Sequence, residues 1–212
     1  MTIEEMYQEA ASRIRQKGKF FVAKMIIGNW FLQGFLYKDR SEKIFSIVLE
    51  VIIFIFFVIL FSQLFELIFS AIIGFVITHT VTWTLNGHFW ALMLETELSR
   101  FTTGEVRLLN YAKGMSARLQ ERKCFAAMLA YGSISRGEVH SRSDLDIRLV
   151  CEQGISNRIV GCTISTIERI KAFFMHFPLD IHMVDSVEKL KVMRIDEKPL
   201  ILFMKPEVRW NG

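Results

Sequence analysis

The sequence predicts an α+β fold, in which a small mixed sheet follows an N-terminal helical region with a two-helix transmembrane hairpin. The chain has 212 residues, a length typical of one domain with an accessory region. Residues 44–85 are strongly apolar and carry only two charged side chains. The last hundred or so residues alternate short apolar segments with one longer amphipathic segment, which is the pattern of a sheet with helical cover.

The apolar segment 44–85 is long enough for two membrane crossings. As a single helix it would extend about 63 Å, roughly twice the thickness of a bilayer core. Divided at the polar residues 62–66, it gives two runs of about twenty residues, each of which fits one crossing. We therefore expect a helical hairpin with a short turn at 62–66, although no Gly or Pro marks that turn.

The charges around this segment predict its orientation and its partner. Lys38, Arg40 and Lys43 precede the hairpin, whereas its turn has no Lys or Arg. The positive-inside rule then places both chain ends in the cytoplasm, as expected of a multi-pass membrane protein. Because the basic residues flank an almost uncharged middle, a lipid bilayer is the expected partner, and we expect no DNA partner.

Two ionisable residues lie inside the predicted hairpin. Glu50 and His79 are equally far from the turn, so an antiparallel hairpin would place them at one depth. Ionisable residues within a membrane are candidates for function. We expect Glu50 and His79 to approach each other or a common polar partner; the alternative is that Glu50 only extends to the interface.

The remaining N-terminal residues are expected to be peripheral. Residues 1–43 predict amphipathic helices at the interface, the first opening with a capping box at Thr2 and Glu5. Residues 20–37 mix lysines with aromatic and aliphatic side chains, which is typical of a helix in the headgroup region. A third spanning helix over 20–37 stays open as an alternative. Residues 86–104 are expected to form a linker helix.

Residues 105–212 predict the α+β domain. Three cysteines lack the spacing of a metal or redox site and are expected to be buried in a reducing compartment. Strands are expected over 124–133, 144–151, 179–185 and near 199–204, with helices over 157–177 and near 186–193.

Two aspartates, two residues apart on one predicted strand, are the candidate catalytic residues of this domain. Asp144 and Asp146 lie on one face of the strand 144–151, about 7 Å apart along the backbone. Two uncompensated carboxylates on the core face of a sheet are costly. A divalent cation, Mg²⁺ or Mn²⁺, removes that cost, and Mg²⁺ prefers carboxylates together with phosphate oxygens. Asp180, on the next strand, would complete a three-carboxylate site for two metals.

The turn before the aspartates predicts an anion site. Gly132 and Ser133 can present backbone N–H groups and a hydroxyl to phosphates, because glycine allows close backbone approach. Arg136 adds a fixed positive charge for the same anion. A site of this kind suits phosphoryl or nucleotidyl transfer by a two-metal mechanism.

These residues resemble a known signature. Gly132-Ser133, ten further residues and Asp144-Leu145-Asp146 resemble the signature of the polymerase-beta-type nucleotidyltransferase superfamily. The segment Ser133 to Gly137, with the Ser143-Asp144 pair, resembles its minimal nucleotidyltransferase branch. The resemblance covers residues 105–205. It implies a nucleotidyltransferase domain with Gly132 and Ser133 at the triphosphate, Asp144 and Asp146 on both metals, and Asp180 on the catalytic metal. The preceding membrane region departs from minimal members, which are usually soluble.

Together these features predict a membrane-anchored nucleotidyltransferase that transfers NMP from an NTP, ATP or CTP, and releases pyrophosphate. The expected acceptor is a hydroxyl or phosphate group of a lipid-linked or small amphiphilic molecule. Two alternatives stay open: an enzyme that modifies protein or RNA at the membrane, and a non-catalytic nucleotide-sensing membrane protein. A homo-oligomer also stays open.

Overall fold

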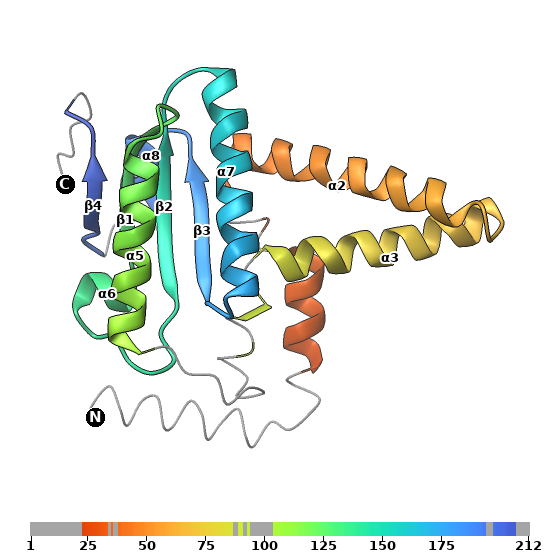
Figure 1. Cartoon of the computed structure of the whole chain (residues 1–212), viewed down its shortest axis with the longest axis horizontal. Coiled ribbons are helices and arrows are strands. Elements are labelled where there is room, and N and C mark those ends of the chain that lie inside the picture. The colour runs from red at the N-terminus through yellow and green to blue at the C-terminus, as the bar shows by residue number, and fades with distance from the viewer. Residues whose placement is uncertain are drawn as a thin grey trace.

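The computed structural model describes residues 23–33, 35, 38–86, 89–90, 93, 104–193 and 197–206. The capping box expected at Thr2 and Glu5 and most of the expected linker helix lie outside these residues. The described chain forms an α+β body from which two long helices project (Figure 1). The predicted α+β class is therefore confirmed.

A four-stranded mixed sheet forms the centre of the body. The strand order is β3-β2-β1-β4, with β3 at one edge. β2 and β3 are parallel, whereas β1 runs antiparallel to both of its neighbours. A parallel pair needs a long crossover, and α7 (Ile155–Phe174) supplies it. The strands are β1 (Phe125–Tyr131), β2 (Leu145–Cys151), β3 (Leu179–Val184) and β4 (Leu200–Met204).

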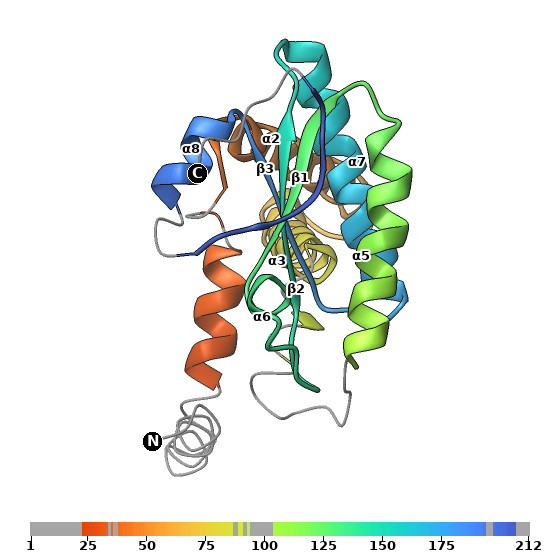
Figure 2. The same ribbon diagram turned by 90° about the vertical axis from the view of Figure 1, so that its left-hand side faces the viewer.

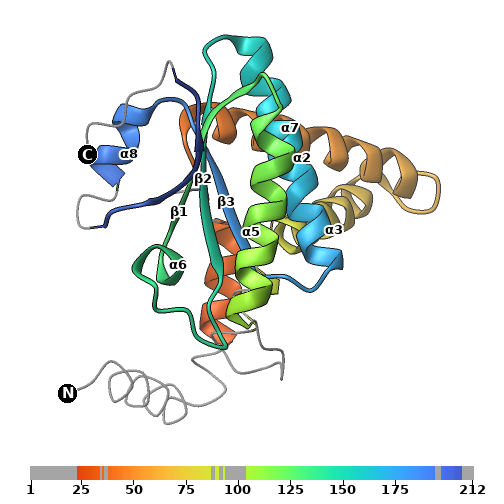
Figure 3. The same cartoon turned by 60° about the vertical axis from the view of Figure 1, so that its left-hand side comes forward.

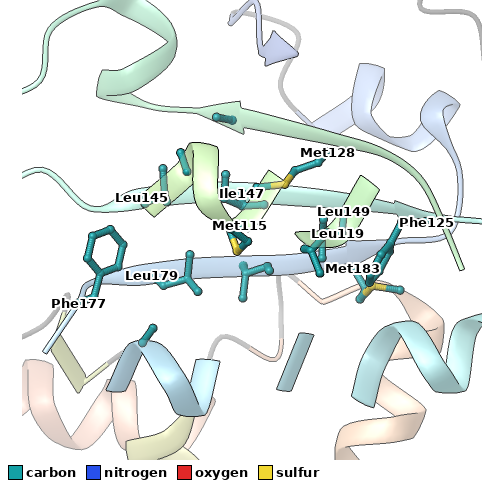
Figure 4. Packing of buried hydrophobic residues seen from close by; sticks show 14 of the residues in the cluster. Met115, Leu119, Phe125, Met128, Leu145, Ile147, Leu149, Phe177, Leu179 and Met183 are labelled. Carbon is teal, nitrogen blue, oxygen red and sulfur yellow. The ribbon is translucent and has the colours of Figure 1, made fainter. Parts of the chain in front are cut away.

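The main core lies between one face of the sheet and two helices. α5 (Glu105–Gln120) and α7 cover this face (Figures 2 and 3). Leu145, Ile147 and Leu149 of β2 are buried in this core, and Figure 4 shows them close to Met115 of α5. Because side chains alternate along a strand, Asp146 and Arg148 lie on the opposite face. The alternation expected for residues 144–151 is present.

The opposite face of the sheet has a smaller cover. Tyr131, Val150, Val184 and Leu190 belong to a second apolar cluster there. α8 (Val187–Met193) covers part of this face (Figure 2). The short helix α6 (Ser133–Arg136) follows β1 directly, so the Gly-Ser turn lies at the end of the central strand. Cys124, Cys151 and Cys162 are buried free thiols, as the sequence predicted.

The two projecting helices are α2 (Arg40–Phe61) and α3 (Leu67–Leu85). Both are long and apolar enough to cross a membrane, and they pack side by side with the turn at 62–66 (Figure 1). A Cβ added at Gly74 would lie 3.1 Å from Val58 Cγ2, so glycine permits their close approach. α2 begins before residue 44, because the Asp39 carboxylate accepts a hydrogen bond from the Arg40 N–H at its start.

The predicted approach of Glu50 and His79 is confirmed. His79 Nδ1 lies 2.6 Å from Glu50 Oε1, and His79 Nε2 lies 3.0 Å from the Trp30 carbonyl oxygen. Trp30 belongs to a helical segment, residues 23–32, that runs across the base of the α2–α3 pair rather than alongside it (Figure 1). Ile27 and Phe31 of this segment are exposed. Whether this segment lies at a membrane interface stays a prediction.

Side chains take the place of a neighbouring strand at the β3 edge. An edge strand otherwise presents unpaired N–H and C=O groups. Asp39 Oδ2 accepts from the Asp185 N–H at 2.9 Å, and Glu42 Oε2 accepts from the Met183 N–H at 3.0 Å. Arg169 Nε donates to the Ile181 carbonyl at 3.1 Å. The start of α2 is therefore joined to the sheet by its two carboxylates.

Asp39→Ala is expected to lower the free energy of unfolding at neutral pH by about 1–2 kcal/mol, since a helix cap is lost. Burial tends to raise the pKa of Asp39, but Lys189 and the N–H groups of Asp185 and Arg40 outweigh it and hold the pKa below its ordinary value. This stabilisation is therefore complete above the unfolded pKa of about 3.9 and is lost as the pH falls through the folded pKa. Denaturant unfolding at several pH values measures it; a difference from wild type that persists unchanged in acid would contradict the prediction.

Candidate functional site

Two of the predicted acids meet on the sheet face opposite α5 and α7. Asp146 of β2 and Asp180 of β3 are register partners on the parallel strand pair. Arg148 lies between them: its Nη1 is 2.5 Å from Asp146 Oδ1, and its Nη2 is 3.6 Å from Asp180 Oδ2. Asp146 and Arg148 are buried. The two carboxylates therefore share one cation, which belongs to the protein.

A histidine supports the second acid. His182 Nε2 lies 3.0 Å from Asp180 Oδ1, and His182 Nδ1 lies 3.4 Å from Glu42 Oε2. Burial tends to lower the pKa of His182, but the carboxylates of Asp180 and Glu42 outweigh it and hold the pKa above its ordinary value. Asp180 is thus linked through His182 to the first turn of α2.

Asp144 occupies a different environment from the other two acids. It is exposed and precedes β2, whose first N–H, that of Leu145, donates to the Pro178 carbonyl oxygen at 2.9 Å. Within the described part of the chain, no three His, Cys, Asp or Glu side chains are grouped so that they could hold a metal ion. The convergence of Asp144 with Asp146 and Asp180 therefore stays a prediction.

The donor chemistry of the acid pair nevertheless fits a divalent cation. Asp146 and Asp180 offer the hard carboxylate oxygens that Mg²⁺ prefers. They already hold a positive group between them, the Arg148 guanidinium. Two facing carboxylates would otherwise repel each other. A metal at this position would take the place of the guanidinium.

An anion-holding turn lies beside the acid pair. Gly132 adopts φ +73°, which favours glycine, and a Cβ added there would lie 3.8 Å from Asp146 Cβ. Glu197 Oε1 accepts from the Gly132 N–H at 2.7 Å and from Arg136 Nη1 at 2.8 Å, and it lies 2.8 Å from Ser135 Oγ. Three donors thus converge on one carboxylate oxygen, as they would on an oxygen of a phosphate.

The Ser133 hydroxyl is not one of the three donors around Glu197 Oε1. Ser133 was expected at the phosphates, but its Oγ is buried and has no hydrogen-bond partner among the described residues. Ser135, two residues later, is the serine beside Glu197 Oε1. Gly132 and Arg136 both contact Glu197, and their role at a phosphate stays a prediction. Glu197 had no local signal, because it follows α8 and reaches the turn only through the fold.

Comparisons with known proteins add no assignment. No protein-family model matches the chain, and no curated protein matches it. The structure defines the class of the protein as an α+β body with a four-stranded mixed sheet and two helices long and apolar enough to cross a membrane. Its function must be argued from the site itself.

Proposed function

We propose that this protein is a membrane-anchored nucleotidyltransferase, which transfers NMP from an NTP to a hydroxyl or phosphate acceptor and releases pyrophosphate. One observation carries the proposal: a carboxylate pair on parallel strands adjoins a turn whose donors hold an anionic oxygen. A metal-bound nucleoside triphosphate needs both parts, a place for its cation and a place for its phosphate oxygens. The donor nucleotide is ATP or CTP.

The residues would act as follows. The Gly132 N–H, Ser135 and Arg136 would hold the triphosphate tail in place of the Glu197 carboxylate. Asp146 and Asp180, with Asp144 at the start of β2, would hold Mg²⁺ or Mn²⁺. When bound, the metal neutralises phosphate charge and lowers the pKa of the acceptor hydroxyl. Asp180, supported by His182, would orient the acceptor hydroxyl and take the proton of that hydroxyl. The hydroxyl oxygen would then bond to the α-phosphorus of the NTP as pyrophosphate leaves.

The position of the hairpin supports an acceptor at the membrane. α2 and α3 project from the β3 edge, and β3 is the strand that carries Asp180 (Figure 1). With the hairpin across a bilayer, the site would lie close to its surface and the body in the cytoplasm, together with both termini. This favours a lipid-linked or small amphiphilic acceptor, because anchoring raises its effective concentration. A protein or RNA acceptor is the alternative.

A second candidate function has an observation of its own. The Arg148 guanidinium already bridges both acids, so the site can balance its charge without a metal. A protein that only senses a nucleotide needs no two-metal chemistry. The second candidate is therefore a non-catalytic nucleotide-sensing membrane protein.

The test uses the full chain purified in detergent, with Mg²⁺ or Mn²⁺, labelled ATP or CTP and membrane lipids. Pyrophosphate release with label in the lipid fraction would support the proposal. Label in protein or RNA would favour the alternative acceptors, and nucleotide binding without turnover would favour the sensor. A chain that binds no nucleotide at all would contradict both functions.

Glu197→Gln is expected to tighten the binding of inorganic tripolyphosphate by about tenfold, since the wild-type carboxylate must leave the turn before a phosphate can enter. Isothermal titration without metal measures this affinity. Glu138→Gln is the matched control, because Glu138 also pairs with Arg136, at 3.1 Å, but is not bonded to Gly132 or Ser135. Equal or weaker tripolyphosphate binding by Glu197→Gln would show that the turn does not hold phosphate.

A further inference from the structure

A cavity lies at the base of the hairpin, away from the acid pair. It has a volume of about 270 Å³, is partly open to the surface, and is lined by the helical segment 23–32, α2, α3 and α7. Its lining residues on α2, α3 and α7 place it near the junction of the projecting helices with the body, a junction that Figure 1 shows. Apolar side chains dominate its walls, among them Phe31, Phe45, Leu49, Ile53, Leu85 and Ile170.

One buried cation lines this cavity. Lys38 is 5 % exposed, and its Nζ donates to Ser46 Oγ at 3.0 Å. Among the described residues no carboxylate lies within ion-pair distance of Lys38, whereas the buried Arg148 contacts two and the buried Arg169 contacts one. A buried charge without a counter-ion is costly. Within the described part of the chain, Lys38 therefore lacks the carboxylate partner that Arg148 and Arg169 have.

The surroundings of Lys38 confirm that its charge is under-compensated. Burial, reinforced by the nearby Arg169 guanidinium, lowers the pKa of Lys38 to about 8. The carboxylates of Glu42 and Glu50 act in the opposite direction but do not outweigh burial. Lys38 remains mostly protonated at neutral pH. An anion that binds Lys38 Nζ would therefore offset the free-energy cost of burying this charge.

We propose that this cavity binds an anionic amphiphile, with a phosphate group at Lys38 and Ser46 and an acyl or similar chain against the apolar walls. The walls argue for a chain, and the unpaired ammonium argues for an anionic head. Glu50 also lines the cavity, but it is held by His79. The site is separate from Asp146 and Asp180, so the inference does not depend on the proposed transferase activity.

The hairpin provides the route by which such a molecule would enter. The surfaces of α2 and α3 expose large apolar side chains, including Ile47, Val51 and Phe75. A lipid beside these helices keeps its chain in contact with them while its head reaches the base of the hairpin. A membrane phospholipid therefore gains apolar contacts along α2 and α3 that a free phosphate ion lacks.

The test measures lipid binding to the full chain in detergent without nucleotide. Dioleoyl phosphatidylglycerol and dioleoyl phosphatidylcholine have the same chains but differ in net charge, and native mass spectrometry reports how much of each is retained. Wild type is expected to bind phosphatidylglycerol at least about tenfold more tightly than phosphatidylcholine. Lys38→Met should bind the two lipids equally.

Lys43→Met is the matched control. Lys43 lies on α2 near the same end of the hairpin, over the Phe35 ring at 5.5 Å, but it does not line the cavity. Lys43→Met should keep the wild-type preference for phosphatidylglycerol.

Lys38→Met should also unfold at a higher temperature than wild type in phosphatidylcholine, because a buried unpaired charge is removed. A wild type without preference, or a Lys38→Met that keeps it, would overturn the inference. If glycerol 3-phosphate, which has no acyl chain, displaced phosphatidylglycerol on its own, the proposal that the ligand is an amphiphile would be wrong.

Discussion

Asp146→Asn reduces metal-dependent pyrophosphate release by at least about 100-fold, if Asp146 holds the cation as proposed. The substitution keeps the size of the side chain and removes only its charge. Asp146 is the better buried of the two acids that share Arg148, and it lies nearest the Gly132 turn. Pyrophosphate release from labelled NTP with Mn²⁺, at saturating and limiting metal, measures the effect.

A matched control separates this effect from a general loss of charge. Asp185→Asn removes a carboxylate just after β3, where Asp185 pairs with Lys189 at 3.3 Å and Arg158 at 3.9 Å, away from the acid pair. It should leave the rate unchanged. Thermal unfolding checks that Asp146→Asn is folded. Full activity of folded Asp146→Asn would contradict the metal assignment, and unchanged nucleotide binding in a chain without turnover would favour the sensor.

The parts of this structure that the sequence predicted depend on local patterns. The alternation of Leu145, Asp146, Ile147 and Arg148 fixes the two faces of β2 whatever the neighbouring strands are. The hairpin depends on run length and on the polar residues 62–66, where the helices do break. Glu50 and His79 could be paired because an antiparallel turn equates their depths. Each of these three predictions depends on residues within one or two neighbouring helices or strands.

The parts that the sequence did not predict depend on contacts between distant elements. The alternation of β2 puts Arg148 on the same face as Asp146, but its bridging role needs the parallel register of β2 with β3. Glu42 resembles any acidic residue in the first turn of a helix, and only the packing of α2 on β3 buries it. Glu197 gives no signal before the fold brings it to Gly132. Long-range ion pairs leave no periodic trace in a sequence.

The charges of the site are balanced by the protein itself in a way that matches the proposed ligand. Arg148 supplies a cation to the acid pair, and Glu197 supplies an anion to the Gly132 turn. A metal-bound nucleoside triphosphate brings one group of each kind. Such a ligand would therefore supply a counter-charge to each half of the site. The prediction for Glu197→Gln and that for Asp146→Asn test the two halves separately.

Glu42→Gln should lower the free energy of unfolding by about 3–5 kcal/mol, because it leaves a buried cation without its partner. Glu42 is 2 % exposed and contacts the equally buried Arg169, and its other oxygen accepts from the Met183 N–H. Glutamine keeps the shape but cannot neutralise the guanidinium. For a chain of this size the loss corresponds to a fall of roughly 10 °C in the unfolding midpoint. Thermal and denaturant unfolding in detergent measure it.

The double variant Glu42→Gln with Arg169→Met identifies the cause. It removes both charges, so it should recover part of the stability that Glu42→Gln loses, since a buried pair replaced by neutral groups costs less than a broken pair. Asp39→Ala, which breaks a more exposed contact of the same helix start, should lose less than Glu42→Gln. If Glu42→Gln and Asp39→Ala were equally mild, the buried pair would not hold α2 on the sheet. The link from α2 through Glu42 and His182 to Asp180 would then have no energetic support.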